Sequence, residues 1–387
     1  GFAITEREAS LLNNQMEYFH QHNKNTTVFQ KSTPWKQGDL LIQKDLATTL
    51  KRIQKNGAKG FYEGKTAELI VEEMKRGNGI ITLNDLKNYK VVEKKPISFN
   101  YKGTEIVSMP LPSSGGILLA QMLKMSGYEN LEKYQHNSTP AVQIMVEAER
   151  RSFADRAEYM GDPQFIKDQT EMLISDAYLK NRWKSFTMNR ATLSSAVGKI
   201  IPQPKESTET THISIIDKEG NAVAVTTTLN GLYGSKVVVS EAGFLLNNEM
   251  DDFSIKPGVP NMFGAVGGEA NAIQPGKRML SSMTPTIVMK NNKPYIIVGT
   301  PGGTTIPTSV YQTIVNIIDF KLSPNMAINS PKFHHQWLPE SILVEKNFPE
   351  STISDLEKNK YTIEKTAQIG RTELIVIDEN GNATAVA

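Results

Sequence analysis

Apolar side chains recur at helical spacing along the first half of the chain, up to about residue 190. Thr5 and Glu8 form a capping-box pattern ahead of the first apolar stripe, which predicts an amphipathic helix. A second stripe follows Asp45 and stops near Gly57, as expected of a second helix. Two more helices are predicted, over residues 66–77 and from Thr139-Pro140 onward. One strand, over residues 101–109, interrupts this helical half.

In the second half the spacing of apolar residues changes to every second position. Three pairs of such segments, each joined by a short polar turn, predict β-hairpins. These hairpins cover residues 213–228, 286–299 and 373–386. A single helix is predicted over residues 310–318, between the second and third hairpins. The chain therefore divides into a helix-rich half and a strand-rich half.

The turns of the first and third hairpins have nearly the same sequence, IDKEGNA at residues 216–222 and IDENGNA at residues 377–383. Asp and Asn side chains readily bond to the backbone of their own turn. We therefore interpret the repeated Gly-Asn-Ala as turn chemistry and not as a catalytic motif.

A polar stretch, residues 198–209, separates the two halves. It contains Pro202 and Pro204 and shows little periodicity, which is typical of an exposed segment that can be cut.

Composition excludes several classes of function. The 387 residues contain 43 basic and 41 acidic side chains, so a net charge of +2 gives no reason to expect nucleic acid or a membrane as partner. The absence of cysteine excludes thiolate nucleophiles, thiolate zinc sites and disulfides, and it fits a secreted or periplasmic protein. No apolar run approaches the length of a membrane span, and the first residues lack the features of a signal peptide. We expect a soluble chain whose start is processed or truncated.

Two tempting motifs carry no chemistry. Gly60 and Gly64-Lys65-Thr66 resemble a phosphate-binding loop, but the first glycine is one residue too close and no strand precedes it. We interpret this segment as a turn before a helix. His334 and His335 are adjacent and make a poor metal pair, so we expect them to pack or hydrogen-bond locally. No metal and no cofactor are predicted.

The candidate chemistry centres on Thr210. Threonine at the start of a strand usually reflects only β-propensity, and its hydroxyl is a poor nucleophile without a neighbouring base. The simplest base is the α-amino group of the same residue, which becomes free if the chain is cut between Glu209 and Thr210. Thr228 ends the partner strand of the same hairpin, where its hydroxyl could reach toward Thr210. The hypothesis is a self-cleaving amidohydrolase.

Three further groups fit an amino-acid amide as substrate. An amide and two carboxylates, Asn230, Glu249 and Asp252, suit an ammonium group. Ser281-Ser282 precedes a strand and could donate hydrogen bonds to a carboxylate. Gly302-Gly303, before a helix, offers backbone N–H groups for an oxyanion hole.

Taken together, the ordered motifs resemble γ-glutamyltransferase, also called glutathione hydrolase. The resemblance extends from about Gly1 to the C-terminus and is strongest after Thr210. The motifs that carry it are TTH at 210–212, DKEGNAVAV at 217–225, TLN at 228–230, GFLLNNEMDDF at 243–253, KPGVP at 256–260, SSMTP at 281–285, TPGG at 300–303 and FHHQW at 333–337.

The resemblance implies an α+β fold, a four-layer αββα sandwich of the N-terminal nucleophile hydrolase type. It also implies a precursor that cuts itself. Residues 1–209 would be the helix-rich C-terminal part of a large subunit, and residues 210–387 the strand-rich small, catalytic subunit. Together the two would form one layered domain.

The resemblance also implies a role for each candidate residue. Thr210 becomes the first residue of the small subunit and the acyl acceptor, and the hydroxyl of Thr228 assists it. Asn230, Glu249 and Asp252 would contact the amino end of the glutamyl group. Ser281 and Ser282 would contact its carboxylate, and Gly302 and Gly303 would form the oxyanion hole. Residues 254–264 match a lid loop over the glutamyl pocket.

Two departures from the family pattern stand out. Family members begin well before this chain does, and the earlier part holds an arginine that pairs with the substrate carboxylate. No arginine here is assigned that role, so either another chain supplies it or the chain is a fragment. At the lid, Phe263 stands where some relatives have a tyrosine, so we expect weaker lid closure.

The expected function is γ-glutamyl transfer and hydrolysis on glutathione and other γ-glutamyl amides through a γ-glutamyl-threonine ester. The expected partners are a small-molecule γ-glutamyl substrate, an amino-acid or peptide acceptor, and the two subunits of one precursor. Three alternatives stay open: a polyglutamate-processing enzyme, a glutaryl-type acylase with the same machinery, and an unprocessed γ-glutamyl-binding protein without turnover. By the resemblance, the protein is expected in the periplasm or outside the cell.

Overall fold

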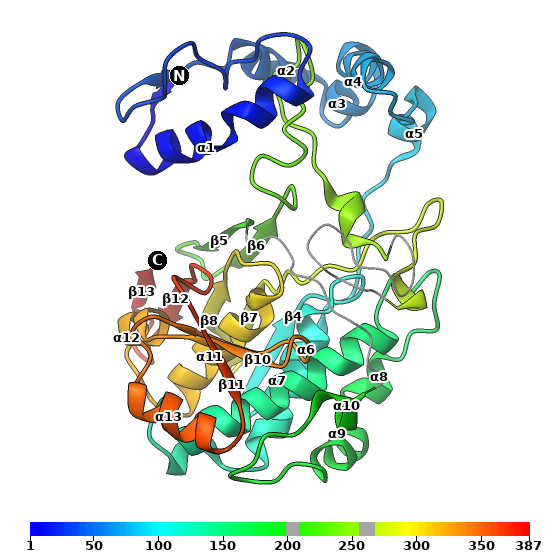
Figure 1. The fold of residues 1–387 in the computed structure, drawn as a ribbon. Coiled ribbons are helices and arrows are strands. Elements are labelled where there is room, and N and C mark those ends of the chain that lie inside the picture. Colours follow the sequence, from blue (N-terminus) through cyan, green and yellow to red (C-terminus); the bar gives the residue numbers. More distant parts are fainter. Residues whose placement is uncertain (199–208, 255–267) are drawn as a thin grey trace. The chain divides into compact units, whose positions relative to one another are not determined.

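The computed structural model describes residues 1–198, 209–254 and 268–387 (Figure 1). Phe263, the predicted lid beyond its first residue and most of the polar stretch before Glu209 lie outside the described residues. The chain forms two compact units, which we call the first and the second unit. The first comprises Gly1–Glu93 and Gly231–Asn248, and the second Lys94–Asn230 and Glu249–Ala387. The predicted division after Glu209 concerns a covalent cut and stays a prediction.

The first unit is mainly helical. Its elements are β1 (Phe2–Ala3), α1 (Glu6–His22), β2 (Leu40–Leu41), α2 (Lys44–Asn56), α3 (Lys59–Tyr62), α4 (Gly64–Arg76) and α5 (Leu83–Asn88). The predicted capping box is present, since the Thr5 hydroxyl accepts from the Glu8 amide and the Glu8 carboxylate accepts from the Thr5 amide. The Thr66 hydroxyl donates to the carbonyl of Gly60 at 2.8 Å, so the apparent phosphate loop is a structural turn, as interpreted.

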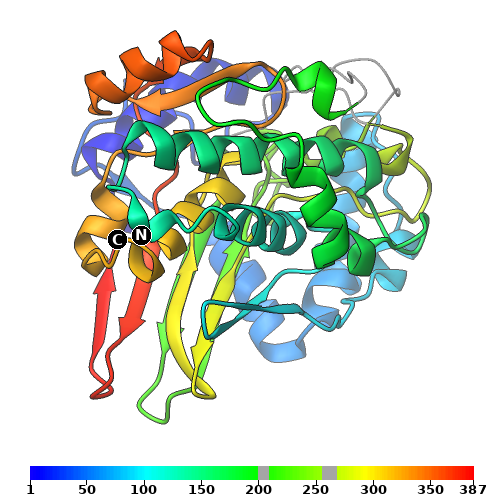
Figure 2. The same cartoon turned by 90° about the horizontal axis from the view of Figure 1, so that it is seen from below.

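The second unit is built on a six-stranded antiparallel sheet with the strand order β13-β12-β8-β7-β4-β3. Its strands are β3 (Ile97–Tyr101), β4 (Thr104–Ser108), β7 (Thr286–Lys290), β8 (Lys293–Gly299), β12 (Glu373–Ile377) and β13 (Ala383–Val386). The helices α6 (Gly115–Gly127) and α11 (Thr305–Ile318) pack on one face of it, and α7 (Thr139–Tyr159) packs on α6 (Figure 2). Val288, Ile296 and Val298 point to this side and join the main core.

The opposite face of the sheet carries a two-stranded hairpin, β5 (Thr211–Ile216) and β6 (Ala222–Thr227). The even-numbered side chains of β5 face the sheet, because Ser214 lies against the carbonyl of Ile297 and the ring of His212 lies against Gly299. The apolar Ile213 on the other side of β5 is 49% exposed. The hairpin therefore turns its polar side toward the sheet.

The remaining elements of the second unit are short. They are η1 (Leu131–Lys133), α8 (Thr170–Leu173), α9 (Asp176–Trp183), α10 (Ser194–Val197), η2 (Glu249–Asp252), η3 (Glu269–Asn271), α12 (Pro324–Asn329), β9 (Phe333–His334), β10 (Ser341–Glu345), α13 (Glu350–Lys358) and β11 (Thr362–Thr366). Strands β11, β10 and β9 form a separate sheet in that order. Among the helices that the structure describes, none is long and apolar enough to cross a membrane.

The three predicted hairpins and the shared turn chemistry are confirmed. In the first turn the Asp217 carboxylate accepts from the Asn221 amide at 2.8 Å, and in the third turn Asp378 accepts from Asn382 at 2.8 Å. In both turns the same asparagine side chain also donates to the aspartate. The repeated sequence therefore encodes one turn used twice.

The prediction of a single strand over residues 101–109 was wrong in one respect. Lys102 and Gly103 form a tight turn with φ of 45° and 78°, so that two strands, β3 and β4, pair across it. Helix α6 was not predicted from the sequence. Eleven of its thirteen residues are buried, so that it is covered on all sides, and such a helix shows no amphipathic pattern.

Candidate active site

The hairpin register brings Thr210 and Thr228 together. Thr211 pairs with Thr227 and His212 pairs with Thr226, so one further step places Thr210 opposite Thr228. The Thr210 hydroxyl donates to the Thr228 hydroxyl at 3.3 Å. The two hydroxyls lie within reach of each other, which is the contact that the hairpin pattern predicts.

The Thr228 hydroxyl uses all of its hydrogen-bonding capacity. It accepts from the Thr210 hydroxyl and from the backbone amide of Asn230, the latter at 2.9 Å. It donates to the carbonyl oxygen of Glu209 at 3.0 Å. A hydroxyl has one proton and two lone pairs, so this set is complete. One side chain therefore contacts both the candidate nucleophile and the peptide carbonyl that would be cut.

The contacts of β5 with β8 indicate which residues lie near Thr210. Ser214 lies over Ile297, and a Cβ at Gly299 would lie 2.1 Å from the His212 ring. We infer that one further step along each strand brings Thr210 over Pro301, directly before Gly302-Gly303. These glycines have φ of 143° and 57°, conformations that favour glycine, and only Thr304 separates them from α11.

Side chains on both sides hold this glycine loop in place. The Thr305 hydroxyl donates to the carbonyl of Gly302 at 2.8 Å. The Thr300 hydroxyl accepts from the amide of Arg371 at 2.8 Å, and a Cβ at Gly370 would lie 2.7 Å from the same hydroxyl oxygen. The C-terminal loop around Gly370 is thus part of the site's support, and the sequence analysis did not find it.

The two adjacent histidines are structural, as predicted. Both are fully buried; His335 Nδ1 accepts from the amide of Trp337 at 2.9 Å, and His334 Nδ1 lies 2.8 Å from the Thr308 hydroxyl of α11. Burial lowers the pKa of His334 to about 4, so it stays neutral. His334 therefore helps to anchor α11, the helix that follows the glycine loop.

The acidic residues and the serine pair are joined by Asn271, which the sequence analysis missed. Glu249 and Asp252 lie on the 3₁₀ turn η2. Asn271 Nδ2 donates to the carbonyl of Asp252 at 2.7 Å, and Asn271 Oδ1 accepts from the amide of Leu280 at 3.0 Å. Leu280 directly precedes Ser281-Ser282, so one buried amide clamps both candidate substrate-binding segments.

The serine pair also rests on the segment that leads into α6. The amide of Ser281 donates to the carbonyl of Pro112 at 2.8 Å, and the amide of Ser114 donates back to the carbonyl of Ser281 at 2.8 Å. Ser282 is 5% exposed. A rigid backbone therefore fixes where the two hydroxyls stand.

Burial perturbs two ionisable groups among the candidate segments. Burial raises the pKa of the Glu249 carboxyl above its usual range. Burial lowers the pKa of His212 to about 4, while its two ring nitrogens lie 2.8 Å from the Thr226 hydroxyl and 3.1 Å from the Ser214 hydroxyl. His212 is therefore neutral at pH 7 and is occupied by its hairpin, so it does not supply the base for Thr210.

The lowered pKa of His212 predicts a pH-dependent stability. Unfolded histidine titrates near 6.5 and folded His212 near 4, so its contribution is present above pH 6.5 and is lost as the pH falls toward 4. Between pH 7.5 and pH 5 the wild type should lose about 2 kcal/mol more unfolding free energy than His212→Gln. Urea unfolding of both proteins at the two pH values measures the difference, and parallel losses would contradict it.

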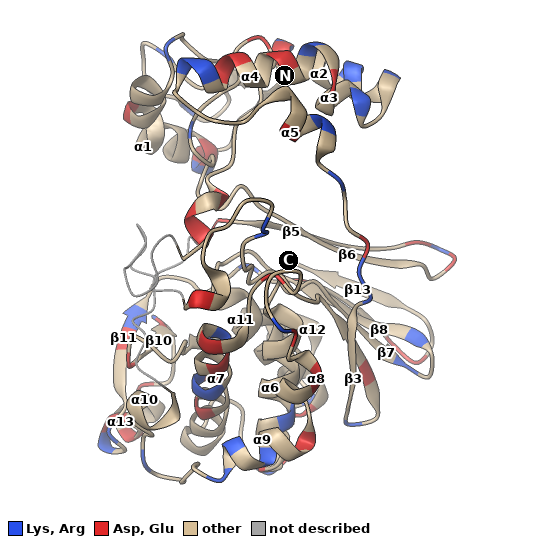
Figure 3. Cartoon of the chain, turned by 90° about the vertical axis from the view of Figure 1, so that its right-hand side faces the viewer, with Lys and Arg blue, Asp and Glu red and all other residues tan. Residues whose placement is uncertain are grey.

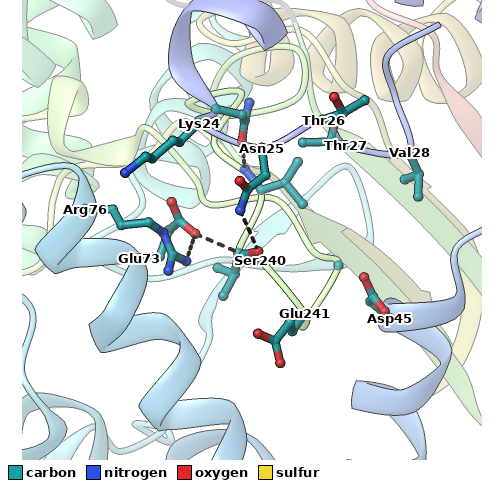
Figure 4. Close-up of a pocket in the computed structure, with 14 residues that line it drawn as sticks. Lys24, Asn25, Thr26, Thr27, Val28, Asp45, Glu73, Arg76, Ser240 and Glu241 are labelled. Atoms are coloured by element: carbon teal, nitrogen blue, oxygen red, sulfur yellow. Dashed lines mark hydrogen bonds and ion pairs between the residues drawn. The ribbon is translucent and has the colours of Figure 1, made fainter.

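A polar pocket in the first unit is a poor candidate for the same chemistry (Figure 4). It has a volume of about 90 Å³, room for a few water molecules, whereas ligand pockets usually measure about 300 Å³ or more. Its Glu73 carboxylate pairs with Arg76 and accepts from the amide of Ser240 at 3.1 Å, so these charged groups are occupied internally.

Comparison with known proteins gives consistent matches over the chain. The gamma-glutamyltranspeptidase family model matches residues 1–387. A glutathione hydrolase proenzyme from Escherichia coli (strain K12) is 46% identical over 385 residues, covering 98% of this chain and 66% of that protein. One from Pseudomonas sp. (strain A14) is 42% identical over 348 residues, covering 89% of this chain and 60% of that protein. The chain thus spans about two thirds, or less, of the length of these curated relatives.

A solved structure shows the fold independently. Cephalosporin acylase from Bacillus halodurans aligns with 100% of this chain and 69% of its own, with a TM-score of 0.83 and 23% identity. At that identity the likeness shows the fold alone. It confirms the predicted fold class, an α+β layered sandwich.

Proposed function

The chain belongs to the gamma-glutamyltranspeptidase family, and from this premise we propose that it cuts itself before Thr210 and then transfers or hydrolyses γ-glutamyl groups. The proposed substrates are glutathione and other γ-glutamyl amides. The observation that carries the proposal is the Thr228 hydroxyl, which contacts both the Thr210 hydroxyl and the Glu209 carbonyl. Through this hydroxyl, the candidate nucleophile and the carbonyl of the peptide bond that it would cut share one hydrogen-bonding partner.

The geometry supports self-cleavage by an acyl shift. The Thr210 oxygen attacks the carbonyl carbon of Glu209 while Thr228 donates its proton toward the carbonyl oxygen, where negative charge develops. The C–N bond then breaks, and the proton from the Thr210 hydroxyl ends on the new α-amine. Water hydrolyses the resulting ester, which leaves a Glu209 carboxylate and restores the Thr210 hydroxyl.

The freed amine then provides the base for turnover. An unperturbed α-amino group has a pKa of roughly 7.7–8.0, so part of it is neutral at pH 7 and can accept the hydroxyl proton. The Thr210 oxygen attacks the γ-carbonyl of the substrate, and the amides at Gly302 and Gly303 hold the oxyanion. One such donor is worth roughly 3 kcal/mol. The leaving amine departs with a proton, and water or an acceptor amine releases the γ-glutamyl group.

The candidate binding groups match the other end of a glutamyl substrate. Glu249 and Asp252 face the α-ammonium group in this proposal, with Asn230 beside them. Binding a cation next to Glu249 would reverse the effect of burial and lower the pKa of that carboxyl. Ser281 and Ser282 take the α-carboxylate.

A glutaryl-type acylase is the main competing function, because a cephalosporin acylase shares the fold. The acidic residues favour the γ-glutamyl substrate. A glutaryl group lacks the α-ammonium and therefore the group that these two carboxylates are proposed to bind, which costs binding energy.

Comparison of two chromogenic substrates tests the proposal. The protein should hydrolyse L-γ-glutamyl-p-nitroanilide with a kcat/KM about 10³-fold above that for glutaryl-p-nitroanilide, because a site built around a polar group rejects the analogue that lacks it. The Asp252→Asn variant is the control. It removes one carboxylate proposed to bind the α-ammonium group, so the ratio of kcat/KM for the γ-glutamyl substrate to that for the glutaryl substrate should be smaller than in the wild type. Equal or reversed preference would identify an acylase, and an intact chain without turnover would identify a binding protein.

We also propose that the two pieces of the cut precursor stay assembled and form the active protein together. The support is that both relatives are named as proenzymes. The location in the periplasm or outside the cell stays a prediction, supported by the family resemblance.

A further inference from the structure

Arg156 lies behind the serine pair, where the sequence analysis assigned no arginine. It is on α7, a buried helix that nevertheless carries many charged residues (Figure 3), and it is 8% exposed. Its Nε donates to the Ser114 hydroxyl at 3.1 Å, and its Nη2 donates to the Ser282 hydroxyl at 3.1 Å. One guanidinium thus bridges the segment before α6 and a candidate substrate-binding serine.

The chemistry of the guanidinium fixes the direction of these bonds. A guanidinium only donates, so the Ser282 oxygen must accept from it. The Ser282 proton is then directed away from Arg156. Because the donor is charged, the bond is strong, and it polarises the hydroxyl so that Ser282 becomes a better donor to a further acceptor.

Ser114 ties the same arrangement to the backbone. Its hydroxyl accepts from Arg156 and donates to the carbonyl of Ser281 at 2.9 Å, and its amide donates to that carbonyl at 2.8 Å. Arg156 therefore contacts the serine pair directly only at the Ser282 side chain, while the hydroxyl and amide of Ser114 hold the Ser281 carbonyl.

We propose that Arg156 is the positioning residue for carboxylate recognition, which orients the Ser282 hydroxyl as a donor to the α-carboxylate of the γ-glutamyl group. This inference rests on the proposed function. Arg156 lies in the helical half of this chain and does not touch the substrate. Its charge favours binding of the substrate carboxylate by orienting the Ser282 hydroxyl.

The test compares substrates with and without the carboxylate. L-γ-glutamyl-p-nitroanilide carries it, and 4-aminobutanoyl-p-nitroanilide does not. Arg156→Met should raise KM for the first substrate tenfold or more with kcat changed less than twofold. It should leave kcat/KM for the second within twofold. Arg156→Lys retains the charge but not the forked geometry, so it should restore part of the loss.

A double-mutant cycle separates orientation of Ser282 from a general structural role. If Arg156 acts through Ser282, adding Arg156→Met to Ser282→Ala should change KM less than twofold. Ser114→Ala removes the acceptor of the Arg156 Nε bond and one donor to the Ser281 carbonyl, but leaves the bond between Arg156 and Ser282 in place. It should give an intermediate KM, which keeps the test usable if Arg156→Met does not fold. Circular dichroism and a denaturing gel establish folding and cleavage for each variant.

The outcomes distinguish failure of this inference from failure of the proposed function. Suppose that the wild type turns over. If Arg156→Met then loses kcat/KM equally on both substrates, or if the effects of Arg156→Met and Ser282→Ala on KM are additive, the role of Arg156 is overturned and the proposed function stands. Absence of wild-type turnover overturns the proposed function, and calorimetric binding of L-glutamate to wild type and Arg156→Met then decides the inference. Weaker binding to the variant supports it, and equal or absent binding overturns it.

Discussion

Thr210→Ala should leave the protein as a single polypeptide without measurable turnover. The substitution removes the attacking oxygen for self-cleavage, and without the cut no α-amine forms to act as base. The expected loss of kcat is at least about 10⁴-fold, as for other enzymes that lose their nucleophile. A denaturing gel and release of p-nitroaniline from L-γ-glutamyl-p-nitroanilide measure the two effects.

The neighbouring Thr211→Ala is the matched control. This substitution removes the same atoms one residue further along β5, where the Thr211 side chain is exposed on the other side of the hairpin. This variant should be cut and should turn over normally. Normal cleavage of Thr210→Ala would refute the role of Thr210.

Thr228→Ala should slow both self-cleavage and turnover, by about 10²-fold each. The hydroxyl that contacts Thr210, Glu209 and the amide of Asn230 is lost, and removal of one oxyanion donor alone costs about 10²–10³-fold. Thr228→Ser keeps the oxygen and should retain most of the activity. The time course of the two fragments on a gel and steady-state kinetics of the matured protein report the two steps separately.

The control for this position is Thr227→Ala, one residue earlier on the exposed side of β6. It should behave as the wild type. If Thr228→Ala is cut and turns over at the wild-type rate, the contact between the two threonines plays no part in the chemistry.

Local chemistry explains what could be predicted of the fold. The capping box at Thr5 and the Asp-Asn turns form within a few residues, so the sequence alone reveals them. Helix α6 could not be predicted from the spacing of its apolar residues, because it is buried on all sides. The β3–β4 turn escaped because Lys102-Gly103 lacks the usual Asn-Gly signal.

The same distinction holds for the candidate site. Thr210 and Thr228 are related by the register of one hairpin, which alternation along the strands predicts. Asn271, Arg156 and Gly370 act through contacts between distant segments, and Arg156 lies 126 positions from Ser282. No local pattern marks such residues, although a buried arginine among the paired charges of α7 could have been a signal once burial was known.

The intact mass of the purified protein after prolonged incubation shows whether the chain cuts itself between Glu209 and Thr210. We expect two masses, corresponding to residues 1–209 and 210–387, with Thr210 as the new N-terminal residue of the second piece. A single mass for all 387 residues, unchanged by incubation, would contradict this expectation.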